Sequence, residues 1–475
     1  MKLLRYQKTA LALIVGILFS CSHELQQVDL THSDMSILES SNSFNLVSSI
    51  SNHHYVQNLD IVLGDVKQGQ IYNLYTTTTE IDNILDGFES MGVGGIRITI
   101  FAEGVNPNKP MFDYFYTEAK ARGFKIFANP MEYRGGQKIA NGMGPDQGTG
   151  PSVLGSTTAT ETLINRVIDF AQEYAVDWIC PFNEDGGPGK HWTAAQMNTI
   201  FSSVHAANLN GAQLIGPCTY GIPEGIAVLN NTNIKDYISI ATTHNLGFHH
   251  DKWPDFIAAA GPLPVWDSET NNRKKFPDKD VRIDAAINAG VDGLVLYNSL
   301  KGIDWTDGTL TGTGVNANSG QDFKDKITQY YFVQNKETGD RIKPYTNFDN
   351  NSLIVEVPSY WNGVYSQWEL VPVENGWYRL KNRGGGTYVR PETNNDFSNI
   401  LSKTSFYGTA LHVQWRTNDA GNGFVFIENR GTGKVLNARN YDDLGNNNDV
   451  EVIKIQQVPN FWTGNWSQWQ LIEAN

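Results

Sequence analysis

Positive charge is scarce in this chain of 475 residues, because 36 Lys and Arg stand against 50 Asp and Glu and give a formal net charge of −14. A nucleic-acid partner is therefore not expected, since phosphate binding needs a basic surface. Cysteine is also scarce, and only Cys180 and Cys218 lie beyond residue 21. They fall in neighbouring predicted strands, where they could form a disulfide, although buried thiols that act as small apolar residues are the favoured interpretation.

A hydrophobic run long enough to span a bilayer is missing at the N-terminus, where the apolar stretch covers only residues 10–19. The basic residues that precede it are typical of an export signal and are Lys2, Arg5 and Lys8. The run ends at Leu18-Phe19-Ser20-Cys21, which resembles a bacterial lipoprotein signal and implies lipidation of Cys21. An ordinary secretory peptide is the alternative. We expect an exported protein, either lipid-anchored in the cell envelope at the outer membrane or secreted, with a signal over residues 1–21 and a polar tether over 22–44.

Short apolar β-branched segments then alternate with segments of helical period. The predicted strands are 56–63, 95–101, 124–130, 177–182, 212–217, 238–244, 263–268 and 292–297, and the intervening helices include 80–91, 111–122, 160–174, 193–208 and 280–289. Eight strands joined by helices predict a closed (β/α)₈ TIM barrel over residues 45–325. A doubly wound open sheet is the alternative, but no glycine-rich phosphate loop follows the first strand.

The remaining residues, 326–475, are strand-like and contain three repeats. Three similar segments end at Asn335, Asn382 and Asn429, which are spaced 47 residues apart, and each leads into a glycine turn. Each repeat later reaches a Gln-Trp ending, and an aromatic pair precedes it at 360–361, 406–407 and 461–462. Repeats of this length are too small to bury a core alone, so we expect them to pack about a pseudo-threefold axis.

These repeats resemble the ricin-type β-trefoil of lectins and carbohydrate-binding modules, which implies an all-β sugar-binding domain. We expect the tryptophans of the Gln-Trp endings in its core, because each repeat needs a large apolar residue at the axis. Trp361, Tyr407 and Trp462 are the predicted sugar platforms, since a flat aromatic face suits the C–H face of a pyranose. Ordinary packing of these three rings is the alternative.

Two glutamates follow predicted strands at the end where a TIM barrel carries its chemistry. Asn183-Glu184 follows the fourth strand and Glu269 follows the seventh. The barrel segment here resembles the large clan of retaining glycoside hydrolases that has an Asn-Glu after strand four and a Glu after strand seven. The resemblance implies that Glu184 is the acid/base and Glu269 the nucleophile. Retention requires the two carboxyl groups to lie about 5 Å apart.

Other residues receive supporting roles from their strand positions. Arg97 on the second strand could keep the nucleophile ionised or act as a structural cation. The resemblance implies that Asn183 binds the sugar 2-hydroxyl. His244 could orient Glu269, contact substrate or be a structural histidine. Further substrate contacts are expected, because sugar clefts are rich in aromatics and amides, at Trp192, Tyr220, Trp266 and Asn298. No cofactor or metal is expected, since the loop histidines lack a metal-binding spacing.

The predicted function is retaining endo-hydrolysis of a β-linked polysaccharide, of the β-glucan or β-galactan (agar) type. The trefoil would keep the enzyme on its polymer by raising the local concentration of sugar. A monomer is expected, in contact with a membrane only through the lipid anchor. The alternatives are a non-catalytic cell-surface glycan-binding lipoprotein and an exo-β-glycosidase.

Overall fold

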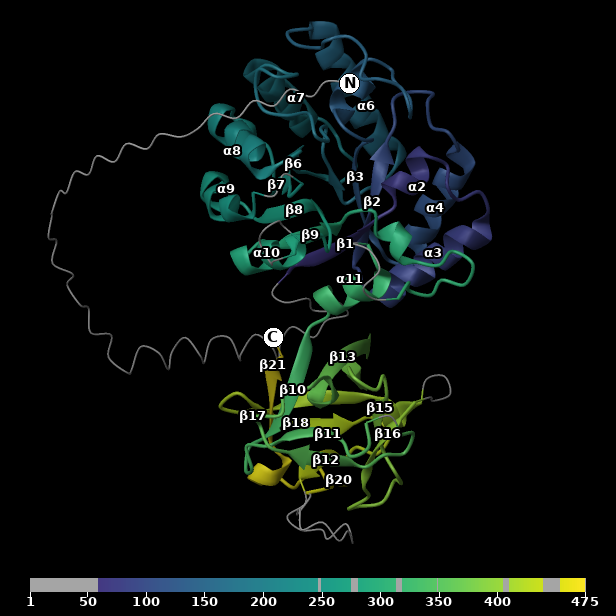
Figure 1. Cartoon of the computed structure of the whole chain (residues 1–475), viewed down its shortest axis with the longest axis vertical. Coiled ribbons are helices and arrows are strands. Elements are labelled where there is room, and N and C mark those ends of the chain that lie inside the picture. Colours follow the sequence, from purple (N-terminus) through teal and green to yellow (C-terminus); the bar gives the residue numbers. More distant parts are fainter. Residues whose placement is uncertain are drawn as a thin grey trace, which may run out of the picture. The chain divides into compact units, whose positions relative to one another are not determined.

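The computed structural model describes residues 59–246, 249–274, 281–312, 318–347, 349–404, 410–438 and 453–474. The predicted signal segment, Cys21 and the tether lie outside the described residues, and so does Tyr407. Two sheets that share no strand account for the described strands. We call the part from β1 to α11 the parallel-sheet domain and the part from β10 to β21 the C-terminal domain (Figure 1).

Nine strands form one parallel sheet in the first domain, in the spatial order β5-β4-β3-β2-β1-β9-β8-β7-β6. They are β1 (Ile61–Asp65), β2 (Gly95–Ile100), β3 (Lys125–Pro130), β4 (Trp178–Ile179), β5 (Gln213–Leu214), β6 (Gly216–Thr219), β7 (Ala241–His244), β8 (Val265–Thr270) and β9 (Gly293–Leu296). The two strands at the ends of this order, β5 and β6, are consecutive in the chain. The sheet is therefore nearly closed, and the carboxyl ends of its parallel strands share one edge.

The prediction of an eight-stranded, closed (β/α)₈ barrel is wrong. The predicted fifth strand, 212–217, is two strands separated by Ile215, and no helix lies between them. β5 pairs with β4 and β6 pairs with β7, while no pairing joins β5 to β6 within the described sheet. Pro217 has no N–H to donate to a strand ladder, and Cys218 has a left-handed backbone with φ 50°. One regular strand cannot run through this segment.

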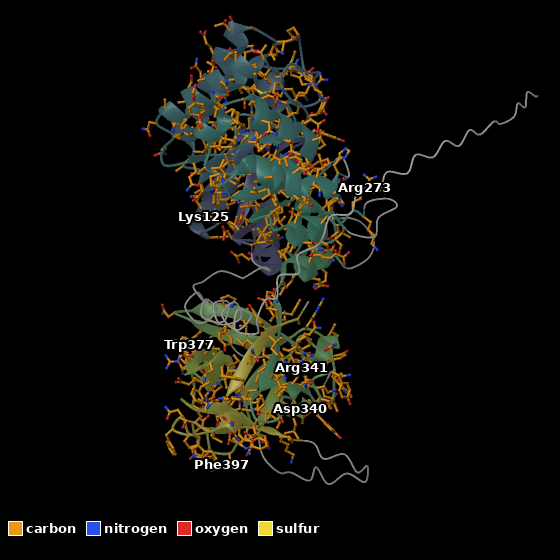
Figure 2. The ribbon with its side chains drawn as sticks, turned by 90° about the vertical axis from the view of Figure 1, so that its left-hand side faces the viewer. Lys125, Arg273, Asp340, Arg341, Trp377 and Phe397 are labelled. Atoms are coloured by element: carbon orange, nitrogen blue, oxygen red, sulfur yellow. The ribbon has the colours of Figure 1, made fainter. Side chains whose placement is uncertain are left out.

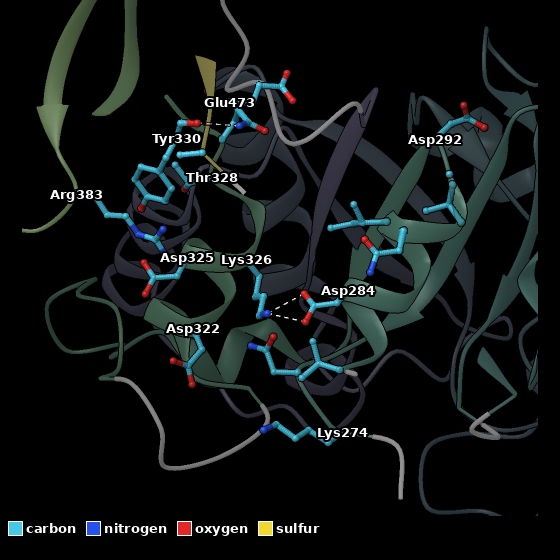
Figure 3. A pocket seen from close by; sticks show the side chains of 18 residues that line it. Lys274, Asp284, Asp292, Asp322, Asp325, Lys326, Thr328, Tyr330, Arg383 and Glu473 are labelled. Atoms are coloured by element: carbon cyan, nitrogen blue, oxygen red, sulfur yellow. Dashed lines mark hydrogen bonds and ion pairs between the residues drawn. The ribbon is translucent and has the colours of Figure 1, made fainter. Parts of the chain in front are cut away.

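The helices of the parallel-sheet domain lie around its strands (Figure 1). They are α2 (Lys67–Ile71), α3 (Thr78–Met91), α4 (Lys109–Ala121), α5 (Gly135–Ala140), α6 (Thr157–Glu173), α7 (Ala194–Ala206), α8 (Ile222–Asn231), α9 (Trp253–Ala260), α10 (Arg282–Ala289) and α11 (Gly320–Ile327), with 3₁₀ turns η1 (Ile234–Asp236), η2 (His250–Lys252) and η3 (Ser299–Gly302). Thr77 caps α3 in a box with Glu80, which fixes where that helix begins. Lys326 of α11 forms an ion pair with Asp284 of α10 at 2.7 Å (Figure 3).

The core explains why the sequence forms this sheet. All six residues of β2 are buried, and so are all six of β8, as expected for parallel strands that are covered on both faces. Helix α3 buries one apolar stripe, which includes Ile81, Ile84 and Phe88. Cys180 and Cys218 are buried and free, as the favoured interpretation expected, but Cys218 is not purely apolar, because its Sγ lies 3.1 Å from Thr242 Oγ1.

The C-terminal domain is a twelve-stranded sheet whose strand pairs, such as β10–β11, β13–β14 and β17–β18, are antiparallel. Its strands are β10 (Tyr330–Asn335), β11 (Arg341–Pro344), β12 (Ile354–Val357), β13 (Gln367–Glu374), β14 (Trp377–Asn382), β15 (Tyr388–Pro391), β16 (Ile400–Lys403), β17 (Trp415–Gly421), β18 (Phe424–Asn429), β19 (Val435–Ala438), β20 (Ile455–Val458) and β21 (Trp469–Glu473). Short 3₁₀ turns precede the Gln-Trp endings at η4 (Val364–Ser366), η5 (Leu411–Val413) and η6 (Asn465–Ser467).

The three repeats have equivalent contacts. Trp368, Trp415 and Trp469 are fully buried, which confirms the prediction that they form the core. Each donates its indole N–H to a backbone carbonyl, at distances of 3.0, 2.9 and 3.0 Å, and the acceptors are Ile342, Val389 and Leu436. The repeated asparagines each donate from Nδ2 to the 3₁₀ turn before a Gln-Trp ending, with acceptors Trp466, Tyr365 and His412. The repetition in the sequence therefore corresponds to one conserved arrangement of buried hydrogen bonds, used three times.

Candidate functional site

Glu184 and Glu269 lie close together at the carboxyl edge of the parallel sheet. Glu184 follows β4, and Glu269 lies near the end of β8. A carboxylate oxygen of each and a ring nitrogen of His244 all lie within 4.8 Å of one another. His244 Nδ1 is 3.7 Å from Glu184 Oε1 and 3.6 Å from Glu269 Oε2. His244 and Glu269 are buried and Glu184 is partly exposed, so a ligand could approach from the side of Glu184.

Arg97 connects Glu269 to a second carboxylate. Its Nη1 donates to Glu269 Oε2 at 2.8 Å, and its Nε and Nη2 hold both oxygens of Asp65 at 3.1 and 2.7 Å. Burial alone would raise the pKa of Asp65, but the Arg97 guanidinium outweighs it and lowers that pKa. Arg97 therefore pairs with both Glu269 and the structural carboxylate of Asp65.

His244 lies between the two glutamates as a buried cation. Burial disfavours the charged imidazolium, but the attraction of Glu269 and the contacts with Cys218 and Glu184 outweigh it and raise the pKa of His244 to about 9. The imidazolium is thus the major form at neutral pH. Its positive charge stabilises an ionised glutamate at this distance.

Backbone geometry fixes where Glu184 projects. Glu184 is left-handed with φ 58°, and its N–H donates to the carbonyl of Cys218 at 2.8 Å. The preceding carbonyl, of Asn183, accepts from the N–H of Gly135 at 2.9 Å. Two neighbouring segments therefore hold this turn in place from both sides, which positions the Glu184 side chain before any ligand binds.

Lys67, at the start of α2, is a site residue that sequence reasoning missed. It is buried, and its Nζ donates to Asn129 Oδ1, Pro130 O and Asn183 Oδ1 at 2.9, 2.6 and 3.0 Å. Burial and the nearby Arg97 guanidinium lower its pKa to about 7, although the carboxylates around it oppose that change. Lys67 therefore titrates near neutral pH. It is hydrogen-bonded to Asn183, the residue that directly precedes Glu184.

Other site residues were also missed, although the signal that identified the glutamates applies to them. Asp65 ends β1, Asn129 lies at the end of β3, and Tyr297 directly follows β9. Burial and the charge of Glu269 raise the pKa of Tyr297, so its hydroxyl stays protonated beside the carboxylates. A polar residue at the carboxyl end of any of these strands is therefore a candidate site residue, as the two glutamates are.

Asn183 is present at the site, but its amide is already engaged. Oδ1 accepts from Asn129 Nδ2 at 2.7 Å as well as from Lys67, and Nδ2 donates to Glu132 O at 2.8 Å. The side chain is 1% exposed. This arrangement holds the turn that carries Glu184.

Two predicted substrate contacts are not brought to the site, which corrects those expectations. Trp192 is fully buried, and its indole N–H donates to Asp185 at 2.9 Å, so the ring offers no face to a ligand. Trp266 is 2% exposed and packs edge-on against Trp178 with 4.9 Å between ring centroids. Trp266 lies near the start of β8, whereas Glu269 lies near its end. Both tryptophans are core residues.

The other two predicted contacts have different surroundings. Asn298 is buried beside the site, and its backbone N–H donates to Asp65 Oδ2 at 2.8 Å. It therefore supports the carboxylate that holds Arg97. Tyr220 directly follows β6 and is 42% exposed, so its ring is accessible to a ligand.

Exposed aromatic pairs mark two repeats of the C-terminal domain. Trp361 and Trp462 are 46% and 42% exposed, and the rings beside them, Tyr360 and Phe461, are 76% and 74% exposed. Large apolar side chains at this exposure are typical of binding surfaces. The predicted platforms Trp361 and Trp462 are thus accessible.

The carboxylates and the histidine could also be considered as metal ligands. Among the described residues, Glu184, His244 and Glu269 form the group whose ligand atoms lie close enough together. The buried Arg97 guanidinium already binds Glu269, however, and His244 carries a proton at neutral pH. A metal needs neutral imidazole and free carboxylate oxygens, so these residues fit a cation poorly.

The comparison with protein families gives one match in the C-terminal domain. Residues 364–453 match the family described as "Ricin-type beta-trefoil lectin domain-like". The chain carries a ricin-type β-trefoil lectin-like domain. This confirms the trefoil prediction and indicates carbohydrate binding by this part of the chain. A comparison with curated proteins gives no match.

Solved structures with some likeness include a designed threefold-symmetric protein, ThreeFoil, at 23% identity and a TM-score of 0.27, covering 30% of this chain and 97% of that one. An exo-β-1,3-galactanase from Clostridium thermocellum has 25% sequence identity and a TM-score of 0.27, and the match covers 31% of this chain and 30% of that one. A GlcNAcα1-4Gal-releasing endo-β-galactosidase from Clostridium perfringens has 21% sequence identity and a TM-score of 0.25, and the match covers 32% of this chain and 33% of that one. The matches span about a third of each enzyme, and TM-scores this low support no statement on activity.

Within the described ranges, no helix is both long and apolar enough to cross a membrane.

Proposed function

We propose that this protein is a retaining glycoside hydrolase that cleaves a β-linked polysaccharide, with Glu184 as acid/base and Glu269 as nucleophile. The observation that carries the proposal is the separation of the two carboxylates, whose oxygens approach within 4.8 Å. Retaining enzymes hold their carboxyl groups about 5–5.5 Å apart, whereas inverting enzymes leave about 6.5–9.5 Å for a water molecule.

The reaction would proceed by double displacement. A Glu269 oxygen attacks the anomeric carbon while Glu184 gives its proton to the leaving oxygen, so that the glycosidic C–O bond breaks and a glycosyl ester forms. Glu184, now a carboxylate, takes a proton from water, and the resulting hydroxide attacks the anomeric carbon and releases Glu269. Each residue returns to its starting protonation state.

The neighbouring cations suit these two steps. Arg97 donates to Glu269 Oε2 at 2.8 Å, which orients the carboxylate and stabilises its negative charge when the ester is cleaved. His244 lies within 3.7 Å of both glutamates and can balance whichever of them is ionised. The Lys67–Asn129–Asn183 hydrogen bonds hold the turn on which Glu184 stands.

The trefoil supports a polymeric substrate, of the β-glucan or β-galactan (agar) type. Its exposed Trp361 and Trp462 would stack on sugar rings and keep the enzyme on a chain that it cuts internally. An export signal with a lipid anchor at Cys21 would place this activity at the cell envelope. Release of monosaccharides instead of oligosaccharides would indicate the exo-acting alternative.

The proposal is tested by incubating the full chain with a panel of β-glycans and measuring new reducing ends. We expect activity on at least one β-glycan, and Glu184→Gln and Glu269→Gln should each abolish it. Glu161→Gln, on the exposed side of α6, is the matched control and should keep full activity. Glycan binding by the trefoil should be unchanged in all three variants. Binding without hydrolysis across the panel would instead favour a non-catalytic glycan-binding protein.

A further inference from the structure

Two cations lie on the outward face of β11 in the first trefoil repeat. The strand alternates, with Ile342 and Pro344 buried and Arg341 and Lys343 partly exposed. Alternate residues of a strand point to the same face, so the two cations lie side by side. Figure 2 labels Arg341 on this domain.

Both cations contact the exposed aromatic loop of the same repeat. Lys343 Nζ lies 5.1 Å from the centroid of the Trp361 ring. Arg341 Nη1 donates to Asn362 Oδ1 at 2.5 Å, and its guanidinium lies 3.7 Å from the centroid of Phe332. Trp361 remains 46% exposed despite these contacts. One flat aromatic face and two positive groups are therefore presented together.

The positive charge of this pair is not neutralised by an ion pair with any residue in the described ranges. Burial lowers the pKa of both Arg341 and Lys343, and no acidic group acts to raise either one. Lys343 Nζ donates to the neutral Asn347 side chain at 3.2 Å. The neighbouring Asp340 carboxylate lies against the backbone N–H of Ser359. An anion that reached Arg341 and Lys343 would supply their missing counter-charge.

The third repeat has the same aromatic loop without the cations. Ile342 and Leu436 are equivalent, because each accepts an indole N–H from a Gln-Trp tryptophan. The positions on either side of Leu436 are therefore Val435 and Asn437, which are both uncharged. Trp462 is exposed to nearly the same extent as Trp361 and packs against Phe397. The two repeats thus share a platform and differ in charge.

The second repeat does not provide a comparable site among the described residues. Arg390 occupies the position of Lys343, but its guanidinium donates to the backbone carbonyls of Pro391 and Glu392. The aromatic pair of this repeat lies outside the described residues. Among the described residues, the charged platform therefore belongs to the first repeat.

We propose that Arg341, Lys343 and Trp361 form a binding site for an acidic sugar, one that bears a carboxylate or a sulfate ester. The indole would stack on the C–H face of the ring, while the guanidinium and ammonium groups would hold the anion. The Trp462 platform takes neutral sugars. This inference rests on the proposed carbohydrate binding and deepens it, because it names an acidic polysaccharide as a ligand of an acidic protein.

Binding is measured on the full chain with Glu184→Gln, so that hydrolysis cannot consume the ligand. Three polymers serve as probes: a polyuronate, a sulfated galactan and a neutral galactan. We expect Arg341→Gln, Lys343→Met and Trp361→Ala each to weaken binding of an acidic polymer by about 10-fold or more. Added salt should weaken binding of the acidic polymer as well. Binding of the neutral galactan should change neither with added salt nor with Arg341→Gln or Lys343→Met. The acidic polymer that binds identifies the anion as carboxylate or sulfate.

Matched variants separate this site from general charge and from folding. Lys381→Met removes one positive charge from the same domain and should leave binding unchanged. Trp462→Ala should weaken binding of the neutral polymer alone. Unfolding midpoints equal to that of the parent would show that no variant has lost its fold. Equal loss on neutral and acidic polymers, or no loss on either, overturns the acidic-sugar site but leaves carbohydrate binding intact. Failure to bind either acidic polymer overturns the acidic-sugar site, and failure to bind any polysaccharide, β-glucans included, overturns carbohydrate binding as well.

Discussion

Arg97 Nη1 lies 2.8 Å from Glu269 Oε2 while the same guanidinium holds both oxygens of Asp65, so one buried cation serves two buried carboxylates. Removal of that cation would leave the buried Asp65 without its ion-pair partner and Glu269 with only the His244 imidazolium beside it. Breaking a buried ion pair costs about 3–5 kcal/mol, whereas an exposed pair contributes about 0–1 kcal/mol.

We therefore expect Arg97→Met to lower the free energy of unfolding by about 3–5 kcal/mol, as measured by urea denaturation at pH 7. Activity should fall at the same time, because Glu269 loses the group that orients it. Arg122→Met is the control, since Arg122 pairs with Asp86 at the surface, and it should cost less than about 1 kcal/mol. A loss for Arg97→Met no larger than that for Arg122→Met would contradict the ion-pair assignment.

His244 makes stability depend on pH. Its pKa is raised from 6.5 to about 9, so the folded protein binds one proton more than the unfolded chain between these values. The stabilisation is complete below pH 6.5 and is lost as the pH rises through about 9. In this window the unfolding free energy of the wild type minus that of His244→Gln should fall by about 1.4 kcal/mol per pH unit. Denaturation at four or five pH values measures this difference, and a flat difference curve would show that His244 is neutral in the fold.

Lys67 should produce the opposite slope. Its pKa is lowered from 10.5 to about 7, so above pH 7 the unfolded chain binds the extra proton and stability rises with pH. The wild type minus Lys67→Met difference should rise by about 1.4 kcal/mol per pH unit between pH 7 and 9. The contributions of His244 and Lys67 would then nearly cancel in the wild type over that range. Parallel curves for wild type and Lys67→Met would exclude a perturbed lysine.

Local patterns in the sequence predicted the strands that are regular and failed where tertiary contacts decide. Buried β-branched residues gave 95–101 for β2, which spans Gly95–Ile100. The predicted strand 177–182 is only Trp178–Ile179 in the structure, because the chain then turns toward Asn183 and Glu184. Residues 212–217 form parts of two strands, β5 and β6, which do not pair with each other, so the described sheet does not close into the predicted barrel.

In the candidate site, too, local sequence patterns identified some residues, while tertiary contacts determined the others. Position at a strand end identified Glu184 and Glu269, since all parallel strands end at one edge. Lys67 could not be found in this way, because its partners Asn129 and Asn183 lie 62 and 116 residues away in sequence. Trp192 was misassigned because its sequence position does not reveal that Asp185 accepts its indole N–H.

The trefoil offers a stability test within one residue type. Trp415 is fully buried and its indole N–H donates to Val389 O at 2.9 Å, whereas Trp361 is 46% exposed. Trp415→Ala should lower the free energy of unfolding by about 3–5 kcal/mol, since it creates a cavity and leaves a buried carbonyl unpaired. Trp361→Ala should cost less than about 1 kcal/mol. Thermal and urea denaturation measure the free energy of unfolding of both variants. Equal losses would mean that Trp361 is packed in the core of the domain.

The separation of the carboxylates makes a stereochemical prediction for the proposed reaction. Oxygens of Glu184 and Glu269 lie within 4.8 Å of one another, whereas inverting enzymes keep their carboxyl groups about 6.5–9.5 Å apart to admit a water molecule. The first product of a β-linked substrate should therefore be the β-anomer, formed by two successive inversions. Proton NMR within the first minutes of hydrolysis separates the anomers before mutarotation mixes them. An α-anomer formed first would mean that water attacks directly, and Glu269 would then have to act as a base and not as a nucleophile.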